Sequence, residues 1–468
     1  MTTIDNQTIC AISTAPGIGG VAVIRVSGMD ALSVCDKIFQ AKNKTKSILS
    51  QQPYTVLFGH ILCEEEILDE VLVSVFHAPH SFTGENTVEI TCHGSVYIQQ
   101  EILKLLLQNG CRMATAGEFT QRAFLHGKMD LSQAEAVADL IASSSAATHR
   151  LAMNQMRGGF SQELEKLRTQ LLHFVTLIEL ELDFSEEDVE FADRGKLVEL
   201  AGNIQKLISH LADSFSVGNA IKNGVPVVIV GETNVGKSTL LNLLLNEEKA
   251  IVSNIHGTTR DVIEDIINLR GIDFRFIDTA GIRETEDEVE SIGIERTFEK
   301  IDQASIVIWM IDATQFSERI EEIADQIVPR IVGKPLIIVF NKTDKIDAEE
   351  QVILEHEFLP DLDVPRIYLS AKYKINTSVL EDTLLKSAHL SKLDENDVII
   401  TNLRHYEALK KALQAIDRVC EGLQTGISGD FLSQDIRECL HFLGQITGKE
   451  INAEEVLGNV FRNFCIGK

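Results

Sequence analysis

The segment Gly231–Thr239, with the sequence GETNVGKST, constrains the fold of this chain more than any other feature. It follows the β-branched apolar run 225–230 and precedes the apolar run LLNLLL, so a strand, a glycine-rich loop and a helix are predicted in that order. In the pattern G-x-x-x-x-G-K-[ST], backbone N–H groups and a helix N-terminus surround a polyphosphate. We expect Lys237 to reach the β- and γ-phosphates and Ser238 to place its hydroxyl on magnesium (Mg²⁺). The segment therefore predicts a P-loop nucleotide-binding domain.

Length and charge limit what else the chain can be. Its 468 residues exceed what one hydrophobic core can hold, so we expect several domains. A net charge of −27 argues against a broad nucleic-acid-binding surface and leaves only local RNA contact. No basic and apolar leader and no run of membrane-spanning length is present, which predicts a cytoplasmic protein without membrane contact. The eight widely spaced cysteines contain no C-x-x-C pair and predict reduced thiols.

Changes in hydrophobic periodicity divide the chain into four segments. Residues 1–125 mix β-branched runs with two helical runs and predict an α+β domain. Residues 126–222 have helical periodicity, with a capping-box pattern at Ser132-x-x-Glu135, and the helical period returns in residues 389–468. Residues 223–388 alternate strand and helix. We therefore predict one discontinuous α-helical domain into which an α/β Ras-like P-loop domain is inserted; two independent helical domains are the alternative.

Each chemical motif of the inserted segment follows a predicted strand, where ligands of doubly wound sheets bind. Asp278-Thr-Ala-Gly281 follows DFRFI, at the Walker-B position, where a carboxylate meets the Mg²⁺ shell and a glycine N–H contacts the γ-phosphate. Asn341-Lys-Thr-Asp344 follows PLIIVF, where the carboxylate can accept two N–H groups from guanine that adenine lacks. Ser370-Ala-Lys372 closes the base pocket. Together with the P-loop, these motifs predict a GTP-binding protein.

The residues that hydrolyse GTP are less evident. Ras-like proteins place a water-orienting glutamine directly after DTAG, where this chain has Ile282, and no arginine finger can be assigned within the chain. Asn234 and the segment SNIHGTTRD at 253–261 suggest oxygen ligands for a monovalent cation in place of that arginine.

At this point the chain resembles the tRNA-modification GTPase family MnmE (TrmE). The resemblance rests on GETNVGKST, GTTRD, DTAGIRETEDEVE, NKTD and the C-terminal FCIGK, and it includes PGIGGVAVIRVSG, SFTGE and GKMDLSQAEAVADLI nearer the N-terminus. It implies a potassium-activated GTP hydrolase whose G domains dimerise face to face. The implied potassium (K⁺) ligands are Asn234, Ser253, the Ile255 backbone and Thr258, and the implied Mg²⁺ ligands are Ser238 and Thr259.

Catalysis is then expected from Lys237 and Asn234 together with Glu290, which matches the water-positioning carboxylate of the family. The remaining predicted GTP-binding residues lie in the same motifs. The full set is Asn234, Val235, Gly236, Lys237, Ser238, Thr239, Ser253, Asn254, Ile255, His256, Gly257, Thr258, Thr259, Asp278, Thr279, Ala280, Gly281, Asn341, Lys342, Asp344, Ser370, Ala371 and Lys372.

The resemblance also gives a role to the first domain. Taken singly, Arg25, Glu85 and Lys128 read as ordinary strand or loop charges. In the family, positions matching these three and Lys468 contact a one-carbon carrier of the 5-formyl- or methylene-tetrahydrofolate type, and the domain forms a homodimer. Cations and a carboxylate suit the glutamate tail and the pterin ring. Cys465 is expected near that pocket, with or without a chemical role.

The function implied is addition of a carboxymethylaminomethyl-type group to the wobble uridine of certain tRNAs. A flavoprotein partner of the MnmG (GidA) type would hold FAD and complete a heterotetramer, since no G-x-G-x-x-G follows a strand in this chain. The alternative is a regulatory G protein of ribosome assembly. A basic RNA-binding module would then be expected after the G domain, where this chain has acidic helices and FCIGK.

Overall fold

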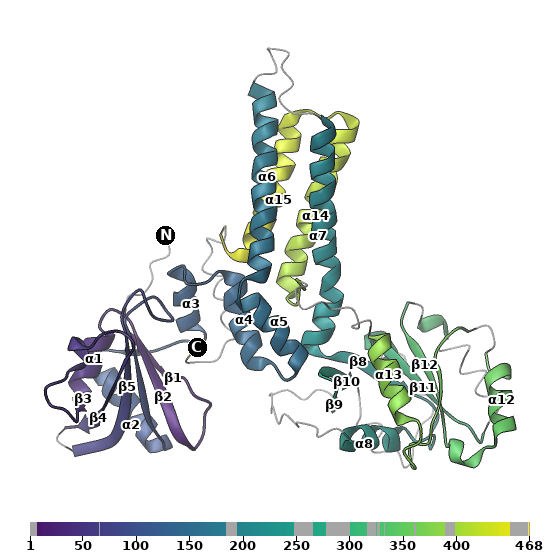
Figure 1. Cartoon of the computed structure of the whole chain (residues 1–468), viewed down its shortest axis with the longest axis horizontal. Helices are drawn as coiled ribbons and strands as arrows, with labels where there is room; N and C mark the ends of the chain where they lie inside the picture. Colours follow the sequence, from purple (N-terminus) through teal and green to yellow (C-terminus); the bar gives the residue numbers. More distant parts are fainter. Residues whose placement is uncertain are drawn as a thin grey trace. The chain divides into compact units, whose positions relative to one another are not determined.

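The computed structural model describes two compact units, which are taken separately below (Figure 1). The first comprises residues 1–142, 152–208 and 407–468, and the second residues 143–151 and 209–406. Helices α5 (Ala146–Met156), α7 (Arg194–Asn223) and α14 (Leu403–Thr425) contribute residues to both. The residues described within these units are 7–64, 66–183, 194–247, 265–277, 300–315, 324, 328–331, 333–359, 362–388, 398–449 and 467.

The first unit begins with a seven-stranded sheet in the order β3-β4-β5-β6-β2-β1-β7, antiparallel except for the β1–β7 pair. Helices α1 (Ala31–Ile38) and α2 (Val96–Gln108) bury one face of it. Side chains along β4 point alternately to the two faces of the sheet. Leu57 and Ile61 are therefore buried under the helices, whereas Val56 is 60% exposed on the other face. The strands are β1 (Ile9–Ile12), β2 (Gly19–Ser27), β3 (Phe39–Ala41), β4 (Thr55–Cys63), β5 (Glu66–Phe76), β6 (Thr87–Gly94) and β7 (Arg112–Met113).

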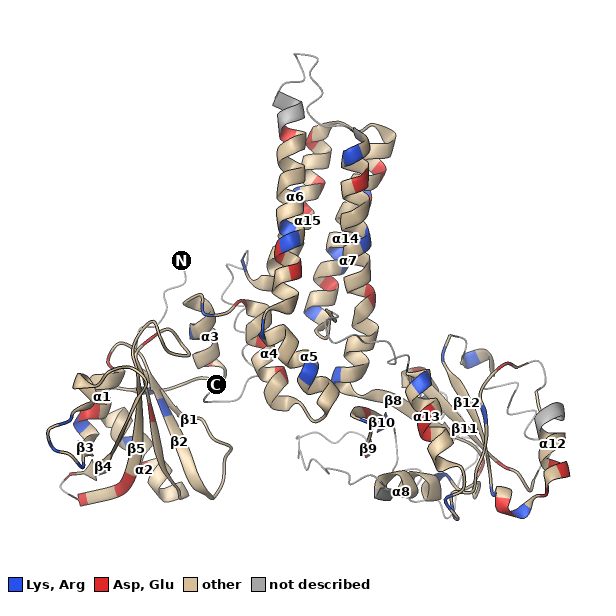
Figure 2. Cartoon of the chain, in the orientation of Figure 1, with Lys and Arg blue, Asp and Glu red and all other residues tan. Residues whose placement is uncertain are grey.

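The same unit contains helices from two distant parts of the chain. Helix α6 (Gly159–Asp183) packs along α15 (Gly429–Thr447), and Gln205 of α7 donates a hydrogen bond to Asp417 of α14 at 2.6 Å. The apolar series at spacings of three and four on α6, from Leu164 to Ile178, is buried, as expected from the helical periodicity of this segment. Figure 2 shows Lys and Arg interspersed with Asp and Glu along these helices. One discontinuous helical region is therefore present, although the exact predicted boundaries stay predictions.

The capping box at the start of α4 (Leu131–Ala142) lies two residues before the predicted position. Asp130 Oδ1 accepts a hydrogen bond from the Gln133 N–H, and the Asp130 N–H donates to Gln133 Oε1, both at 2.9 Å. Ser132 lies inside the helix, and its hydroxyl is 3.0 Å from the hydroxyl of Ser161. The short helix α3 (Glu118–Leu125) precedes α4. None of the helices in the described part of the chain has a long enough apolar stretch to cross a membrane.

The second unit is built on a six-stranded sheet in the order β13-β12-β11-β8-β10-β9. All neighbours are parallel except the β9–β10 hairpin. Apolar clusters cover both faces, as expected for a doubly wound sheet. The elements are β8 (Val225–Val230), α8 (Lys237–Glu247), β9 (Asp265–Leu269), β10 (Ile272–Phe276), β11 (Ile306–Asp312), β12 (Leu336–Asn341), α12 (Ala348–Glu357), β13 (Arg366–Tyr368) and α13 (Thr377–Ser387). Among the described residues, 3₁₀ helices lie at Val328–Arg330 and Thr343–Lys345 in this unit and at Ile48–Ser50 in the first.

The sequence predicts strands in the inserted segment at VPVVIV, DFRFIDT, SIVIWMID, PLIIVF and PRIYLS, and these are confirmed as β8, β10, β11, β12 and β13. Strand β9 was not predicted. Within this unit, the Ile400 N–H donates to Ser214 Oγ at 3.1 Å, and the rings of Phe215 and Tyr406 stack with centroids 4.5 Å apart.

Candidate functional site

The P-loop connects the end of β8 to the start of α8, as its sequence predicts. Lys237 Nζ donates to the carbonyl oxygens of Gly231 and Glu232, both at 2.7 Å, so the ammonium lies over the loop that would surround a phosphate chain. Burial lowers the pKa of Lys237. Asn234 lies exposed at φ 62°, and Ser238 is half-buried in the first turn of α8. The loop is therefore suited to bind a phosphate chain, and the Ser238 hydroxyl and the Asn234 amide lie where they can coordinate cations.

Asn341 joins three of the predicted motifs. Its Nδ2 donates to the Val235 carbonyl of the P-loop at 2.7 Å, and its Oδ1 accepts from the Ala371 N–H at 3.0 Å. Gly236 has φ +103°, and a Cβ at this position would lie 2.3 Å from Asn341 Nδ2. Glycine is therefore required both for the backbone conformation and for the close approach of the amide. The phosphate loop and the two base-recognition loops are thus held together by one buried side chain.

Asp344, the predicted guanine reader, lies three residues after the buried Asn341. Its Oδ1 accepts a hydrogen bond from Ser370 Oγ at 2.6 Å, while the residue itself is exposed. Ser370 therefore fixes the orientation of the carboxylate from the SAK motif. An oriented acceptor of this kind can receive two N–H donors from guanine.

Lys342 makes a contact that was not predicted. Its Nζ donates to Asp312 Oδ2, at the end of β11, at 2.5 Å. Burial alone would raise the pKa of Asp312, but hydrogen bonds from Lys342 and Thr314 outweigh it and lower the pKa. The apolar sequence SIVIWMID ends on this aspartate, and a carboxylate at the end of an apolar run was the sequence signal that could have predicted the contact. The pair therefore connects the base-recognition loop to the end of β11.

Several predicted residues lie outside the described part of the chain. These are the 253–259 segment, the 278–281 motif, Glu290, Cys465 and Lys468. Their roles as K⁺, Mg²⁺, GTP, water or folate contacts stay predictions.

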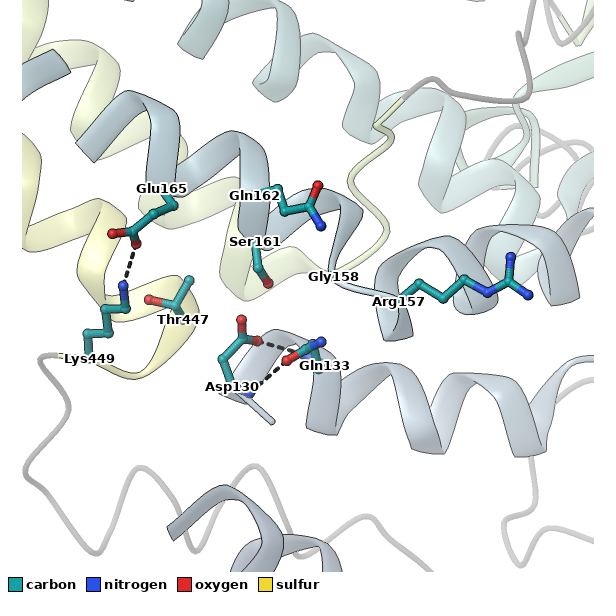
Figure 3. Close-up of a pocket in the computed structure, with 9 residues that line it drawn as sticks. All are labelled: Asp130, Gln133, Arg157, Gly158, Ser161, Gln162, Glu165, Thr447 and Lys449. Carbon is teal, nitrogen blue, oxygen red and sulfur yellow. Dashed lines mark hydrogen bonds and ion pairs between the residues drawn. The ribbon is translucent and has the colours of Figure 1, made fainter. Parts of the chain in front are cut away.

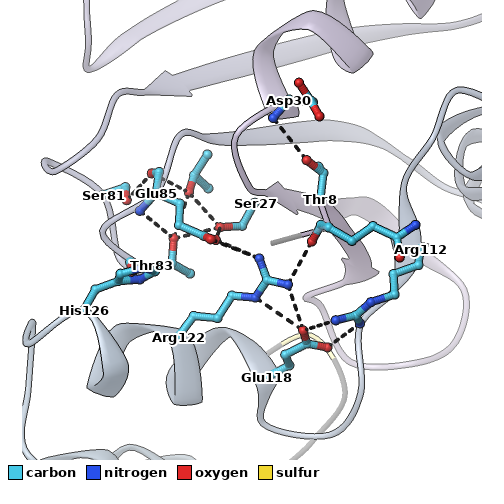
Figure 4. Close-up of polar contacts among 12 residues, drawn as sticks. Thr8, Ser27, Asp30, Ser81, Thr83, Glu85, Arg112, Glu118, Arg122 and His126 are labelled. Atoms are coloured by element: carbon cyan, nitrogen blue, oxygen red, sulfur yellow. Dashed lines mark hydrogen bonds and ion pairs between the residues drawn. The ribbon is translucent and has the colours of Figure 1, made fainter. Parts of the chain in front are cut away.

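The three predicted folate residues that the structure describes all border the loop 79–85. Lys128 Nζ donates to the Pro79 carbonyl at 3.0 Å. Arg25 donates to Glu89 at 2.8 Å, and its guanidinium lies 5.3 Å from the ring centroid of Phe82. Glu85 accepts from Ser27 Oγ, two residues after Arg25, at 2.8 Å (Figure 4). The structure therefore brings these distant charges to one region of the sheet.

Sequence reasoning missed the residues that hold Glu85. Arg122, whose side chain is 3% exposed, donates from Nη1 to both oxygens of Glu85 at 3.0 Å and from Nη2 to Glu118 at 2.9 Å. Arg112 binds Glu118 in turn (Figure 4). Burial alone would raise the pKa of Glu118, but hydrogen bonds from Arg112, the Thr115 backbone and Arg122 lower it to about 2. The network keeps the Glu118 carboxylate ionised beside the predicted pocket.

Gly467, in the C-terminal FCIGK motif, contacts the same domain. Its carbonyl accepts a hydrogen bond from Ser13 Oγ at 3.0 Å. A Cβ on Gly467, which has φ +96°, would lie 2.1 Å from the Ile12 carbonyl oxygen at the end of β1. Only glycine permits this approach.

A separate polar cavity of about 310 Å³ lies where α4 and α6 begin (Figure 3). Asp130 and Gln133 in its wall cap α4, and Lys449 pairs with Glu165. Because these groups bind one another and none is a predicted site residue, we assign the cavity no ligand.

Comparison with known proteins gives consistent matches. Residues 8–128 match the family model of the GTP-binding protein TrmE N-terminus, and residues 131–465 match that of the MnmE helical domain. The tRNA modification GTPase MnmE of Bacteroides thetaiotaomicron is 62% identical over 467 residues, covering 99% of this chain and 100% of that protein. The protein of the same name from Flavobacterium johnsoniae is 55% identical over 469 residues, with the same coverage.

Among solved structures, Era of Aquifex aeolicus bound to GDP and AlF₄⁻ is 32% identical. The match covers 41% of this chain and 66% of that chain at a TM-score of 0.28, which is too low to carry a structural argument.

Proposed function

Because the chain belongs to the family of tRNA modification GTPases MnmE and is a GTP hydrolase, we propose that it modifies the wobble uridine of certain tRNAs in the cytoplasm. The group added is of the carboxymethylaminomethyl type, and GTP hydrolysis drives the cycle. A flavoprotein partner of the MnmG (GidA) type supplies FAD and much of the tRNA-binding surface, in keeping with the net charge of −27 on this chain.

The observation that carries the GTP-dependent part is the Asn341 side chain, which joins the P-loop to both base-recognition loops. With these three loops fixed relative to one another, the distance between the phosphate and guanine sites is set before nucleotide binds. Asp344, oriented by Ser370, supplies the preference for guanine. Lys237 holds the β- and γ-phosphates, and Ser238 with Thr259 holds Mg²⁺, which neutralises charge on the phosphates.

Potassium activation is supported by the position of Asn234. Its side chain is exposed on the P-loop, beside the phosphate site, where an amide oxygen can coordinate a cation. Ser253, Ile255 and Thr258 complete the K⁺ ligands in the proposal, and Glu290 positions the attacking water. A cation held there supplies the charge stabilisation that an arginine finger gives in other GTPases.

The one-carbon site of the proposal lies beside the loop 79–85. Arg25 and Lys128 provide positive charge there, and Glu85, paired with Arg122, provides an acceptor. Lys468 follows Gly467, whose carbonyl is bound by Ser13 of the same domain. We assign this region to a 5-formyl- or methylene-tetrahydrofolate-type carrier.

Homodimerisation is supported by apolar side chains on the sheet face that α1 and α2 leave open. Phe58 and Leu72 lie opposite each other on β4 and β5 and are 41% and 46% exposed. Val56, on the same face, is also exposed. Neighbouring apolar side chains of this kind mark an interaction surface on a soluble domain.

The test is mass spectrometry of tRNA nucleosides from cells that lack this chain. We expect the carboxymethylaminomethyl uridine to be lost, restored by the wild type and not restored by Lys237→Ala. Normal wobble uridine in the deletion strain would contradict the proposal and favour a ribosome-assembly G protein, to be followed by ribosome-profile analysis.

A further inference from the structure

The β9–β10 hairpin lies between the two sequence segments expected to contact the nucleotide. Thr259 precedes β9, and Asp278 follows β10. In the antiparallel register, Asp265 at the start of β9 pairs with Phe276 at the end of β10, so both segments adjoin the same end of the hairpin. The turn at Arg270 and Gly271 is at the other end, about 17 Å away for strands of five residues.

That turn end is bonded to the start of helix α5. Ser144 Oγ donates to Asp273 Oδ2 at 2.6 Å, and we name this the hairpin contact. Asn268 Nδ2 donates to the other oxygen of Asp273 at 2.6 Å and holds the carboxylate in place. The Ala147 N–H is 3.4 Å from the Gly271 carbonyl. Asp273 is 8% exposed, and its described partners are neutral donors, so the loss of one is costly.

Helix α5 leads from this contact to α4. Its residues Ala147 and Leu151 pack against the sheet core that contains Ile267 and Leu269 of β9. Near its other end, Gln155 donates to the Ser132 carbonyl at 2.8 Å, and the Met156 carbonyl accepts from Gln133 at 3.1 Å.

We propose that the hairpin contact transmits the nucleotide state from the hairpin to α5, with Ser144 and Asp273 as positioning residues. Ligand-dependent strain or displacement at one end of a hydrogen-bonded hairpin moves the other end, because the ladder keeps the two strands in register. The contact makes α5 follow that movement. The inference rests on GTP binding and hydrolysis and does not depend on the tRNA or folate chemistry.

The experiment measures hydrogen–deuterium exchange of residues 146–156 in the full chain. Exchange is compared between the GDP state and the state with a non-hydrolysable GTP analogue and Mg²⁺, with nucleotide occupancy measured on the same samples. In the wild type, we expect exchange of α5 to differ at least fivefold between the two states. In Ser144→Ala, the difference falls below twofold, while Ser144→Thr retains the hydroxyl and the wild-type difference.

Ser145→Ala is the matched control. Ser145 Oγ accepts from the Thr148 N–H at 3.2 Å and caps the same helix without touching Asp273. This variant raises exchange of α5 in both states and keeps the difference between them. GTP turnover in all variants stays within threefold of the wild type, because none of these residues touches the nucleotide loops.

Three results would overturn the proposal. They are a wild type whose α5 is insensitive to nucleotide, a Ser144→Ala variant that keeps the full difference, and an equal loss of the difference in Ser144→Ala and Ser145→Ala. A parallel fall in GTP turnover would equally reject it, since the contact would then serve the integrity of the site. Failure of GTP binding itself is recognised separately from the occupancy measurement.

Discussion

Replacing Asn341 with alanine tests whether the three nucleotide loops depend on one side chain. Asn341→Ala removes the hydrogen bonds to the Val235 carbonyl and from the Ala371 N–H, and Val235 and Ala371 are both buried. A buried polar group that loses its partner costs about 1–3 kcal/mol. Water entering the vacated volume would recover part of this, so we expect the domain to lose about 2–4 kcal/mol of unfolding free energy.

Urea unfolding measures this loss directly, because the single tryptophan of the chain, Trp309, is buried in β11 of the same domain. With a slope of about 2 kcal/mol per molar urea, the midpoint should fall by about 1–2 M. GTP affinity should fall by at least about tenfold, equivalent to 1.4 kcal/mol, because binding must now order the loops.

Asn376→Gly is the control for this experiment. It removes an exposed hydrogen bond to the Tyr368 carbonyl in the same domain, at a φ of 58° that glycine tolerates. Its unfolding free energy should change by less than about 0.5 kcal/mol. An unchanged midpoint in Asn341→Ala would refute the energetic reasoning. A lowered midpoint with GTP affinity within threefold would show that Asn341 stabilises the domain without organising the site.

Three further predictions concern charge and ions. The pKa of Glu118, lowered from 4.5 to about 2, means that its ionised form contributes about 3 kcal/mol of stability above pH 4.5, which is lost as the pH falls toward 2. Glu118→Gln should lose that stability at neutral pH and flatten the acid dependence in circular-dichroism unfolding; an unchanged profile would contradict the ionic assignment. Asp344→Asn should lower GTP affinity by about 100-fold or more and favour xanthine nucleotides in competition binding, so unaltered base selectivity would remove Asp344 as the reader. Exchange of K⁺ for Na⁺ should slow GTP turnover by about 100-fold or more, whereas equal rates in the two salts would reject the cation role of Asn234.

The nucleotide loops could be predicted from sequence because their chemistry is local. Gly236, Lys237 and Asp344 lie at fixed offsets from apolar strands, and the ends of parallel strands meet at one edge of a sheet. The position of the capping box of α4 could not be predicted from the local sequence alone. Asp130-x-x-Gln133 and Ser132-x-x-Glu135 both fit the general pattern, and the folded chain uses the first, while the Ser132 hydroxyl bonds to Asp130 and lies 3.0 Å from that of Ser161.

The Arg122 network was not predictable for a related reason. Arg122 lies 37 positions from Glu85 on a short helix that carries no motif, and only the folded sheet brings the two together. Strand β9 was missed because DIINL lies between charged and polar residues and gains its order by pairing with β10.

The hydrogen bond between Ser214 and Ile400 has a consequence for the order in which the chain folds. These residues are 186 positions apart, and the stacked rings of Phe215 and Tyr406 lie beside them. Once the inserted domain has folded, this bond holds Ile400, just before α14, against α7. The two helices then behave as if a loop of about ten residues joined them, in place of one of 186. The entropy cost of bringing them together falls by about 2–3 kcal/mol relative to an unstructured insert. Folding of the GTPase domain during synthesis therefore prepares the helices to associate when residues 407–449 leave the ribosome.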